Sequence, residues 1–490
     1  MFHFIFGEIF LNSLKDLIKD KSFVGGQWTE DSEQGNLDVL DKYNQNVLAS
    51  IPFLDPSQIE QAVQTSEEAF RKMSKWSAGE RAEKIQNLYE LLEEKKELFT
   101  ELICIEAGKP IKYARAEMER CLYVLSLAKE ECLRFEGEKV AIDFGLGEGK
   151  TAFTKPFPIG PILAISPFNF PLNLVMHKVA PALAIGCSVV LKPSMMTPLT
   201  SLAFSELVDK AGFPPGTLNT LVCKDKEAEL LVRDERLKAL SFTGSPKVGW
   251  FLKTIAGRKK VVLELGGNAA VIVDEMADIE KVAKDLCGGS FLYSGQICIS
   301  TQRIYAHYSV FEELKEALIK NIESLSVGDP KEEGNTVGPL INKEAVERVG
   351  CWIEEAWEGG AIVLTGGNVL DEKRNVYAPT LLTSTKDTMK VVFEEAFGPL
   401  AVLEKVNSFE EGIERANDSR FGLQVGVYTN SIERMKYAFN QCETGAVIMN
   451  FVPGFRIDNM PYGGVKQSGF GREGIKYAMK DFSEEKLLIY

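Results

Sequence analysis

Histidine is scarce in this chain of 490 residues, and no two cysteines form a Cys-x-x-Cys pair. Three histidines and nine scattered cysteines do not supply the ligand cluster of a zinc site, so we expect no metal centre. Cysteines that are odd in number and spread along the chain indicate reduced thiols rather than a disulfide framework. The sequence therefore predicts a cytoplasmic protein without a structural metal.

Basic residues do not outnumber acidic ones, so the chain lacks a positive surface charge. The formal net charge is −14 and the isoelectric point is near 5.1. Nucleic acids and anionic membranes both attract proteins with a basic footprint. We therefore expect no nucleic acid and no membrane among the partners.

Uninterrupted hydrophobic runs of membrane-spanning length are also missing. The segment 172–191 is largely apolar, but it contains Asn173, His177, Lys178, Pro181 and Ser188. A buried helix followed by a strand explains this stretch better than a membrane span. The apolar stretch Met1–Leu11 is broken by Glu8 and follows no basic region, so it is a poor signal peptide, and its role stays open.

What is present is the composition of a large globular enzyme, with 45% apolar and 26% charged residues. Between residues 56 and 134, apolar residues recur at three- and four-residue steps, which predicts amphipathic helices. From Gly160 onward, short apolar strands alternate with helical patterns, and a second alternation runs from 278 to 451. This pattern predicts two α/β domains with parallel sheets that meet near residues 264–270.

Two glycine-rich stretches resemble phosphate-binding loops only by their letters. Residues 469–474 fit G-x-G-x-x-G, but they lie far from the first βα unit and we expect no strand before them. Residues 145–151 (GLGEGKT) are one residue short of a phosphate-binding loop and precede a strand-like run. We expect neither to bind a nucleotide.

Three polar residues end predicted strands or occupy a turn, where side chains reach a ligand crevice. Cys298 lies in a turn rich in glycine and hydroxyl groups, between a helical run and a strand. Glu264 follows an apolar strand and precedes two glycines, and Asn169 also follows a strand. Each residue alone also fits a structural role: a buried thiol, a solvated carboxylate or a turn-capping amide. Together they suggest a covalent catalyst with a cysteine nucleophile.

The motifs around these residues resemble those of the NAD(P)-dependent aldehyde dehydrogenase superfamily. They are SPFNFPL, KPS, FTGS, ELGGN, GQICIS, EEAFGP and MPYGGVKQSG, in the family order and spacing, and the match covers the chain from about Phe23. The resemblance implies an enzyme with the family fold. That fold combines a Rossmann-like parallel-sheet cofactor domain with an α/β catalytic domain and a small β oligomerisation arm.

The resemblance implies catalytic roles for five residues. Cys298 would attack the aldehyde carbon to give a thiohemiacetal, and the Asn169 amide with the Cys298 backbone N–H would form the oxyanion hole. Loss of hydride would leave a thioester, which Glu264 would help to hydrolyse as general base. Lys178 and Glu473 match the proton-relay positions behind Glu264, although an ordinary ion pair also fits them.

The same resemblance implies the cofactor contacts. Lys192 would reach the adenosine ribose, and Ser245, after Gly244 at a helix start, would contact the pyrophosphate. Glu395 would hold the nicotinamide ribose beside Phe397. The cleft would also be lined by Ser166, Phe168, Ser194, Met195 and Leu265.

One position departs from the pattern of strict NAD users. They commonly carry a glutamate three residues after the lysine, and that glutamate binds the 2′-hydroxyl and repels a 2′-phosphate. Here the position is Met195. No acidic residue there rejects a phosphate, so the expected cofactor is NAD or NADP.

The substrate is the least constrained part of the prediction. Arg120 and Arg456 fall where relatives hold anionic groups, Arg303 is close to an arginine of semialdehyde enzymes, and Phe170 lines the same region. An arginine fork suits a carboxylate, phosphate or sulfonate, but structural ion pairs fit equally well. The tail motif is most similar to lactaldehyde-type and related small-aldehyde dehydrogenases. The expected substrate is a small polar or anionic aldehyde of the lactaldehyde or semialdehyde type.

Domain and assembly expectations follow from the resemblance. Residues 1–134 and 153–263 would form the NAD(P)-binding domain, and 264–453 the catalytic domain. Residues 135–152 and 472–490 resemble the oligomerisation arm, so we expect a homodimer or a dimer of dimers, that is, a homotetramer.

Three other activities stay open at this point. A CoA-acylating semialdehyde dehydrogenase is one alternative, although such enzymes often lack the glutamate that is present here as Glu264. A non-phosphorylating glyceraldehyde-3-phosphate dehydrogenase is another. A non-catalytic use of the fold is the third, and the intact Cys298 argues against it.

Overall fold

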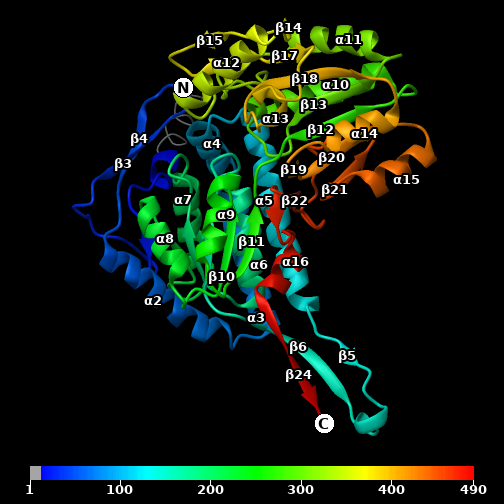
Figure 1. Cartoon of the computed structure of the whole chain (residues 1–490). Coiled ribbons are helices and arrows are strands. Elements are labelled where there is room, and N and C mark those ends of the chain that lie inside the picture. The colour runs from blue at the N-terminus through cyan, green and yellow to red at the C-terminus, as the bar shows by residue number, and fades with distance from the viewer. Residues whose placement is uncertain (1–12) are drawn as a thin grey trace.

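The chain folds around two large sheets built mainly from parallel strands. The computed structural model describes residues 13–490, so the apolar tail Met1–Leu11 discussed above lies outside the described residues. In Figure 1 one sheet and its helices lie above the other, and a narrow arm projects below them. The two predicted α/β alternations correspond to these two sheets.

The first sheet has eight strands in the order β2-β1-β9-β8-β7-β10-β11-β23. Strands β7 to β11 pair in parallel, and most of their residues are buried, because helices cover both faces. The bounds are β1 Phe23–Val24, β2 Gln27–Trp28, β7 Ile162–Ile165, β8 Val189–Lys192, β9 Leu218–Thr220, β10 Ala239–Thr243, β11 Lys260–Glu264 and β23 Gly469–Phe470.

The second sheet has seven strands in the order β14-β17-β18-β13-β12-β20-β21. All neighbours are parallel except β14, an edge strand that runs antiparallel to β17 and departs from the parallel pattern expected from the sequence. The bounds are β12 Ala269–Val273, β13 Thr301–His307, β14 Ile362–Thr365, β17 Thr380–Thr383, β18 Leu400–Val406, β20 Gln424–Tyr428 and β21 Ala446–Met449.

The predicted helices of the first third are present, and their ends follow local sequence signals. Asp55 caps α2 with a reciprocal capping box, and Gly108 ends α4 in the left-handed conformation at φ 64°. The helices are α2 Pro56–Met73, α3 Ala78–Glu94, α4 Lys96–Ala107 and α5 Ile111–Arg134. The apolar faces of α3, α4 and α5 join one core with α6 (Asn173–Ile185), the buried helix expected in the apolar segment 172–191, whereas Ile59, Ala62 and Val63 of α2 pack in a second core.

The remaining helices cover the two sheets. Around the first sheet lie α7 Leu199–Lys210, α8 Asp225–Arg233, α9 Pro246–Ile255 and α16 Ile475–Asp481. Around the second lie α10 Ile279–Phe291, α11 Phe311–Glu323, α12 Lys343–Glu358, α13 Lys390–Phe393, α14 Phe409–Asn417 and α15 Ile432–Gln441. Small two-stranded ladders pair β3 Asn36–Leu40 with β4 Val47–Pro52, β15 Val369–Asp371 with β16 Val376–Tyr377, and β19 Phe421–Gly422 with β22 Val465–Lys466.

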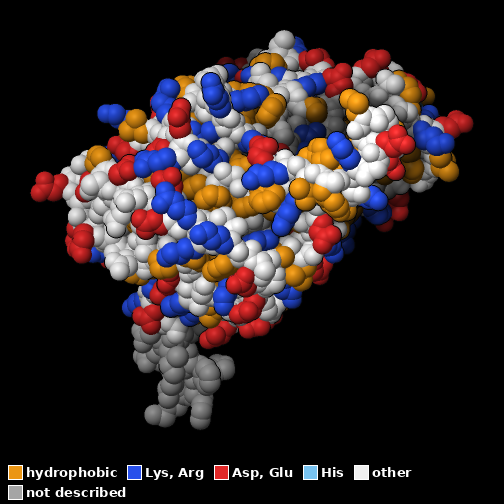
Figure 2. All heavy atoms as spheres, turned by 90° about the horizontal axis from the view of Figure 1, so that it is seen from below, with side chains coloured by type: hydrophobic (Ala, Val, Ile, Leu, Met, Phe, Trp, Pro, Cys, Tyr) orange, Lys and Arg blue, Asp and Glu red, His pale blue; other side chains and the backbone are white. Residues whose placement is uncertain are grey.

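The arm is a three-stranded antiparallel sheet in the order β24-β6-β5. It pairs β24 (Ser483–Ile489) with β6 (Ala152–Pro158), and β5 (Lys139–Val140) lies on the other side of β6. Leu487, Leu488 and Ile489 are each half exposed or more. Figure 2, which views the molecule from the side of the arm, shows apolar side chains in an interrupted band across the middle of this face.

Neither glycine-rich stretch forms a nucleotide-binding loop after a parallel strand. The short strand β22 precedes Gly469, which corrects the expectation that no strand comes before this stretch, but β22 pairs antiparallel with β19 in a two-stranded ladder. Gly469–Phe470 is itself the short strand β23, antiparallel to β11 at the edge of the first sheet. Gly145–Gly147 is a 3-10 turn (η1) in the arm. Within residues 13–490 no helix has the length and apolar character to cross a bilayer, and no group of acidic, His or Cys side chains is arranged to hold a metal.

Candidate active site

Cys298 lies in a turn whose backbone is unusual. The preceding 3-10 segment η2 (Leu292–Gly295) holds Tyr293, Ser294 and Gly295 in the left-handed region, at φ 51°, 57° and 68°. Two non-glycine residues in that region are costly unless surrounding contacts fix them. Here the Tyr293 hydroxyl donates to the Ala107 carbonyl at 2.8 Å, and the Ser294 hydroxyl donates to the Gly338 carbonyl at 2.8 Å. The turn before the thiol is therefore strongly fixed.

The Cys298 thiol is half-buried at one end of a cavity of about 450 Å³. The Tyr462 hydroxyl lies 3.3 Å from Sγ. Burial raises the pKa of the Cys298 thiol to about 12, and the hydrogen bond with Tyr462 acts in the opposite direction. The protein alone therefore holds a protonated thiol, and forming the thiolate requires a proton acceptor or an added positive charge.

Asn169 is buried close to this turn. Its Nδ2 donates to the Gln296 carbonyl at 2.9 Å, two residues before the cysteine. The Cys298 backbone N–H donates to no acceptor within residues 13–490. An amide side chain and a free backbone N–H are thus held near one thiol, as an oxyanion hole requires.

Glu264 ends β11, and the loop after it passes directly beneath the cysteine. A Cβ on Gly267 would lie 2.2 Å from the Cys298 carbonyl oxygen, so only glycine allows the two backbones to approach this closely. Both carboxyl oxygens of Glu264 are buried without a hydrogen-bond partner in the described chain. Burial, and then the negative charge of Glu473, raise the pKa of Glu264 well above its usual range.

Lys178 and Glu473 form a buried ion pair of 2.9 Å behind Glu264. The Lys178 ammonium also donates to the Thr243 hydroxyl at 2.6 Å, and Glu473 accepts from Arg456 at 3.1 Å. These cations hold the pKa of Glu473 below its usual range against the opposing effect of burial. Two nearby carboxyl groups therefore have opposite protonation preferences, the arrangement that separates acid and base roles.

Arg120, Phe170 and Arg456 all line the cavity that contains Cys298. The Arg456 guanidinium lies 3.7 Å from the centre of the Tyr462 ring, and its Nε has no hydrogen-bond partner among residues 13–490. Arg120 donates to Asp458 through Nε at 3.1 Å and through Nη2 at 2.5 Å. Both predicted arginines thus line the same cavity as the thiol, and each also has a carboxylate partner.

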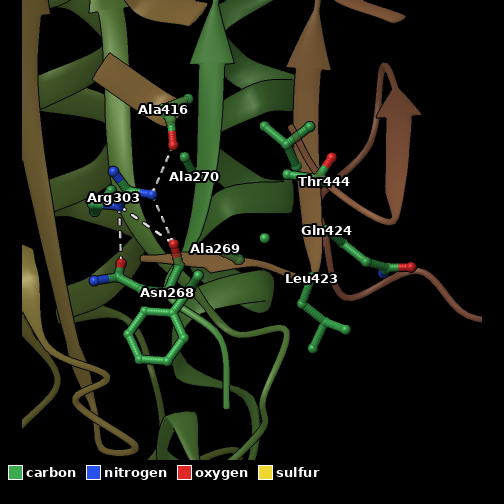
Figure 3. A pocket seen from close by; sticks show the side chains of 11 residues that line it. Asn268, Ala269, Ala270, Arg303, Ala416, Leu423, Gln424 and Thr444 are labelled. Carbon is green, nitrogen blue, oxygen red and sulfur yellow. Dashed lines mark hydrogen bonds between the residues drawn. The ribbon is translucent and has the colours of Figure 1, made fainter. Parts of the chain in front are cut away.

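Arg303 is placed elsewhere. Figure 3 shows its guanidinium bonded to the Asn268 side chain and to the carbonyls of Asn268 and Ala416. It lines a separate small cavity of about 10 Å³ and not the cavity of Cys298. The strand β13 directs this side chain into the sheet's own packing, so the expected substrate contact is not supported and we exclude Arg303 from the site.

A hollow of about 510 Å³, separate from the cavity of Cys298 and called the second hollow below, is lined by Ser245, Glu395 and neighbouring residues. Ser245 is exposed at the N-terminus of α9, and its side chain makes no capping hydrogen bond there. The free N–H groups of such a helix end attract anions. Glu395 accepts from the Gly267 backbone at 2.9 Å, and burial raises the pKa of Glu395 to about 7.

The other predicted cofactor residues follow strand ends of the first sheet. Ser166 follows β7, and its buried hydroxyl has no partner among the described residues. Lys192 ends β8, is buried, and lies 3.5 Å from Asp225. The rings of Phe168 and Phe397 meet edge to face with centroids 5.7 Å apart. An uncapped helix end and an unpaired hydroxyl at this edge fit a long polar ligand with an anionic centre.

Four further predicted residues lie along the same edge. Ser194 and Met195 are half-buried in the loop after β8, where the Ser194 hydroxyl accepts from the Met196 backbone at 3.2 Å. The Gly244 N–H donates to the Glu264 carbonyl at 3.0 Å, and the Leu265 N–H donates to the Ser468 carbonyl at 2.9 Å. The loops from these strands therefore connect the hollow with the general-base candidate.

Comparison with known proteins decides the family. The sequence model named Aldehyde dehydrogenase family matches residues 28–488. The chain belongs to the aldehyde dehydrogenase family. It is 39% identical over 483 residues to a 3-sulfolactaldehyde dehydrogenase of Priestia aryabhattai, covering 98% of this chain and 99% of the relative.

Solved structures of the family superpose over nearly the whole chain. Aldehyde dehydrogenase 21 from Physcomitrella patens, in complex with the reaction product succinate, has a TM-score of 0.92 at 38% identity and covers 96% of this chain and 98% of its own. The glyceraldehyde-3-phosphate dehydrogenase GapN from Methanocaldococcus jannaschii, complexed with NADP, has a TM-score of 0.89 at 36% identity and covers 94% and 100%. The predicted family and fold class are thereby confirmed.

Sequence reasoning missed three residues of this aldehyde dehydrogenase site. Tyr462 contacts the thiol although it lies 164 residues away along the chain. Asp458 and His177 are buried together, with the His177 Nε2 2.8 Å from the Asp458 Oδ1. Tyr462 lies inside the quoted motif MPYGGVKQSG and Asp458 two residues after Arg456, so both were close to recognised signals.

Proposed function

We propose that this chain oxidises a small anionic aldehyde to the carboxylic acid, with NAD or NADP as cofactor and Cys298 as the covalent nucleophile. The observation that carries the proposal is the convergence of Cys298, Asn169 and Glu264, with both Glu264 oxygens buried and unpaired. A base without competing hydrogen bonds has no partner to give up before it accepts a proton from water.

The first step joins the cysteine to the aldehyde. The Cys298 thiol gives its proton to the Glu264 carboxylate, which passes it on before hydrolysis, and Sγ attacks the aldehyde carbon while negative charge moves to the carbonyl oxygen. The Asn169 amide and the Cys298 N–H donate to that oxygen, and one such donor typically stabilises the transition state by about 3–4 kcal/mol. The product of this step is a thiohemiacetal on Cys298.

The cofactor residues are those along the edge of the first sheet. We propose that Lys192, Ser245 and Glu395 hold the dinucleotide, with Phe168 and Phe397 beside its redox-active end. When bound, NAD or NADP supplies the acceptor for the hydride that leaves the thiohemiacetal carbon. Cys298 then carries a thioester.

Hydrolysis of the thioester is the task proposed for Glu264. Its carboxylate takes a proton from water, the resulting hydroxide attacks the thioester carbon, and the acid leaves as Sγ departs. The Lys178–Glu473 pair lies behind Glu264 and suits a route for its proton. A general base of this kind typically contributes about 10²- to 10⁴-fold.

The anionic substrate class rests on the cavity. Two arginines line it with the thiol, and one of them keeps a buried donor without a partner. The names of the relatives point the same way, since one is a 3-sulfolactaldehyde dehydrogenase and one was solved with succinate. Because one relative is named glyceraldehyde-3-phosphate dehydrogenase GapN, a phosphorylated aldehyde is the second candidate substrate.

The test is a substrate panel with the purified protein. Formation of NADH or NADPH is followed with succinate semialdehyde, sulfolactaldehyde, lactaldehyde, glyceraldehyde 3-phosphate and long alkyl aldehydes. We expect the short anionic aldehydes to give the highest kcat/KM. A preference for long alkyl aldehydes would refute the proposal, and acyl-CoA formed in the presence of CoA would favour the CoA-acylating alternative.

We further propose the predicted division into cofactor, catalytic and oligomerisation segments, a homodimer or dimer of dimers, and a cytoplasmic location. The arm supports the assembly because β24 leaves apolar residues exposed along its length. The nine free cysteines support a reducing compartment. Light scattering tests the assembly, and a monomer would contradict it.

A further inference from the structure

The cavity of Cys298 is backed by a buried network of charged groups that the proposed chemistry uses only in part. Asp458 lies at its centre. The Asp458 carboxylate accepts two hydrogen bonds from Arg120. Its Oδ1 also lies 2.8 Å from His177 Nε2 and 3.9 Å from Arg456 Nε. Its side chain is 2% exposed, so its charge is balanced by these neighbours rather than by water.

The network contains more positive than negative charge. Its cations are Arg120, Arg456 and Lys178, and its ionised carboxylates are Asp458 and Glu473. Neighbouring cations and hydrogen bonds keep the pKa of both carboxyls below their usual range. Each cation has a carboxylate partner, but three cations and two carboxylates sum to one positive charge.

The two other titratable groups of the network favour their neutral forms. Glu264 has no hydrogen-bond donor to stabilise a carboxylate, and burial raises its pKa. His177 is buried with its Nδ1 unpaired among the described residues, and burial lowers its pKa. In these favoured neutral forms neither group adds a charge to the count, and Glu264 becomes negative only in the form that acts as the base.

Other charged groups lie outside this network. Arg472, which acts on Glu264, is half-buried and donates to the carbonyls of Gly464 and Gly471 rather than to a carboxylate. Glu117 lines the wall and is paired with the buried Lys109. Asp285 is paired with Lys281, and Lys284 is exposed to water. The charge of Asp285 is matched by Lys281, and the charge of Lys284 is screened by water, so both contribute little to the balance inside.

This network has more free N–H donors than unbalanced positive charges. A guanidinium carries five N–H donors, of which Arg120 uses two on Asp458 and Arg456 uses one on Glu473. Arg456 Nε is buried without a hydrogen-bond partner among the described residues, and the nearest carboxylate oxygen, of Asp458, is 3.9 Å away. The wall thus offers several donors to an anion but can neutralise only one negative charge.

We propose that Asp458 is a specificity-determining residue that restricts the site to aldehydes whose distal group carries a single negative charge. A carboxylate or a sulfonate meets this condition, whereas a phosphate dianion would bring one buried negative charge too many. The inference deepens the proposed function and rests on it. It also separates this chain from the phosphorylated substrate kept above as the second candidate.

The first experiment removes the charge of Asp458 but keeps its shape. We expect the wild-type kcat/KM for succinate semialdehyde to exceed that for glyceraldehyde 3-phosphate by more than about 100-fold, because an unmatched buried charge is strongly disfavoured. In Asp458→Asn the ratio should fall by at least about tenfold, through a lower KM for the phosphate. Asp285→Asn removes a negative charge of the same cavity that is already paired with Lys281, and it should leave the ratio unchanged.

The second experiment needs no variant, so it holds even if Asp458→Asn does not fold. Propanesulfonate and propyl phosphate are compared as competitive inhibitors of the wild-type enzyme at about pH 7.5 and about pH 5.5, since the second pKa of a phosphate ester is about 6. Inhibition by the sulfonate should stay constant, whereas the phosphate should inhibit at least about tenfold better at the lower pH.

The outcomes distinguish the role inferred for Asp458 from the proposed oxidation of an anionic aldehyde. Equal inhibition by propyl phosphate at both pH values, or equal kcat/KM for the phosphate and carboxylate aldehydes, would overturn the role of Asp458 and leave the dehydrogenase activity intact. Oxidation of neutral aldehydes alone would instead refute the proposed anionic substrate, and the inference with it.

Discussion

The two sides of Cys298 are built in different ways. On the substrate side, buried charged groups pair with one another around a cavity of about 450 Å³. On the other side, a hollow of about 510 Å³ is lined by Ser245 at an open helix end and by Glu395, which accepts a single backbone hydrogen bond, from Gly267, within residues 13–490. One side is organised before any ligand arrives, and the other keeps its polar groups available.

This difference has a physical basis. Groups that stabilise developing charge act most strongly when they are fixed in place before the reaction begins. A site proposed to bind and release a large dinucleotide benefits from polar groups that have no protein partner. The ligand can then bind these groups without breaking hydrogen bonds inside the protein. Variants on the first side should therefore change chemical steps, and variants on the second should change cofactor use.

The largest effect is expected from Cys298→Ala. Without the nucleophile no thioester forms, and activity should fall by about 10⁴-fold or more. Binding of NAD or NADP, measured by fluorescence titration, should be retained because the contacts of the second hollow are intact. Cys351→Ala, which removes an exposed thiol, is the matched control and should be unchanged. Wild-type rates of NAD(P)H formation in Cys298→Ala would refute the nucleophile.

Glu264→Gln should slow release of the acid by about 10²- to 10⁴-fold while leaving the first burst of NAD(P)H. Glu264 is a base only when ionised, and its pKa is raised, so wild-type thioester hydrolysis should speed up as pH rises through that pKa. The decay of the acyl-enzyme, followed by rapid quench against pH, should lose this dependence in the variant. Glu404→Gln, another carboxyl with a raised pKa, is the control. An unchanged pH profile would exclude Glu264 as the base.

Asn169→Ala should lower kcat by about 10²- to 10³-fold, the cost of losing one oxyanion donor. Because Asn169 also holds the Gln296 carbonyl at 2.9 Å, the loop could shift as well. Asn169→Asp keeps the shape without an N–H donor and should be equally slow. Normal turnover in either variant would remove Asn169 from the oxyanion hole.

The smallest effect is expected from Met195→Glu on the cofactor side. A carboxylate at this half-buried position should repel a 2′-phosphate and reduce kcat/KM for NADP by about tenfold relative to NAD. Met196→Glu places the same charge on the more exposed neighbour and should change the ratio less. Equal effects of the two variants would show that position 195 does not determine the preference between NAD and NADP.

The sequence predicted the parts of the site that follow from strand order. Glu264 ends a strand and Ser166 and Asn169 follow one, so alternating strands and helices place them at one edge of the first sheet. Cys298 stood out because its turn is rich in glycine and hydroxyl groups. These signals are local in the chain and were recognisable without coordinates.

The failures came from side-chain direction and from distant contacts. Arg303 is only five residues from Cys298, yet its guanidinium bonds to carbonyls across the second sheet. Tyr462 reaches the thiol from a segment 164 residues away. Neither fact follows from periodicity or spacing, because the first depends on how α14 packs against β13 and the second on a contact between distant loops.

The contact of Gly267 with the Cys298 carbonyl has a consequence for engineering. The separation between nucleophile and base strand is set where two main chains touch, without any intervening side chain. Replacing the side chains at positions 264 and 298 should therefore leave the two main chains in the same relative position. The scaffold is suited to carrying new pairs of catalytic side chains, whereas any residue larger than glycine at 267 would force the frame apart.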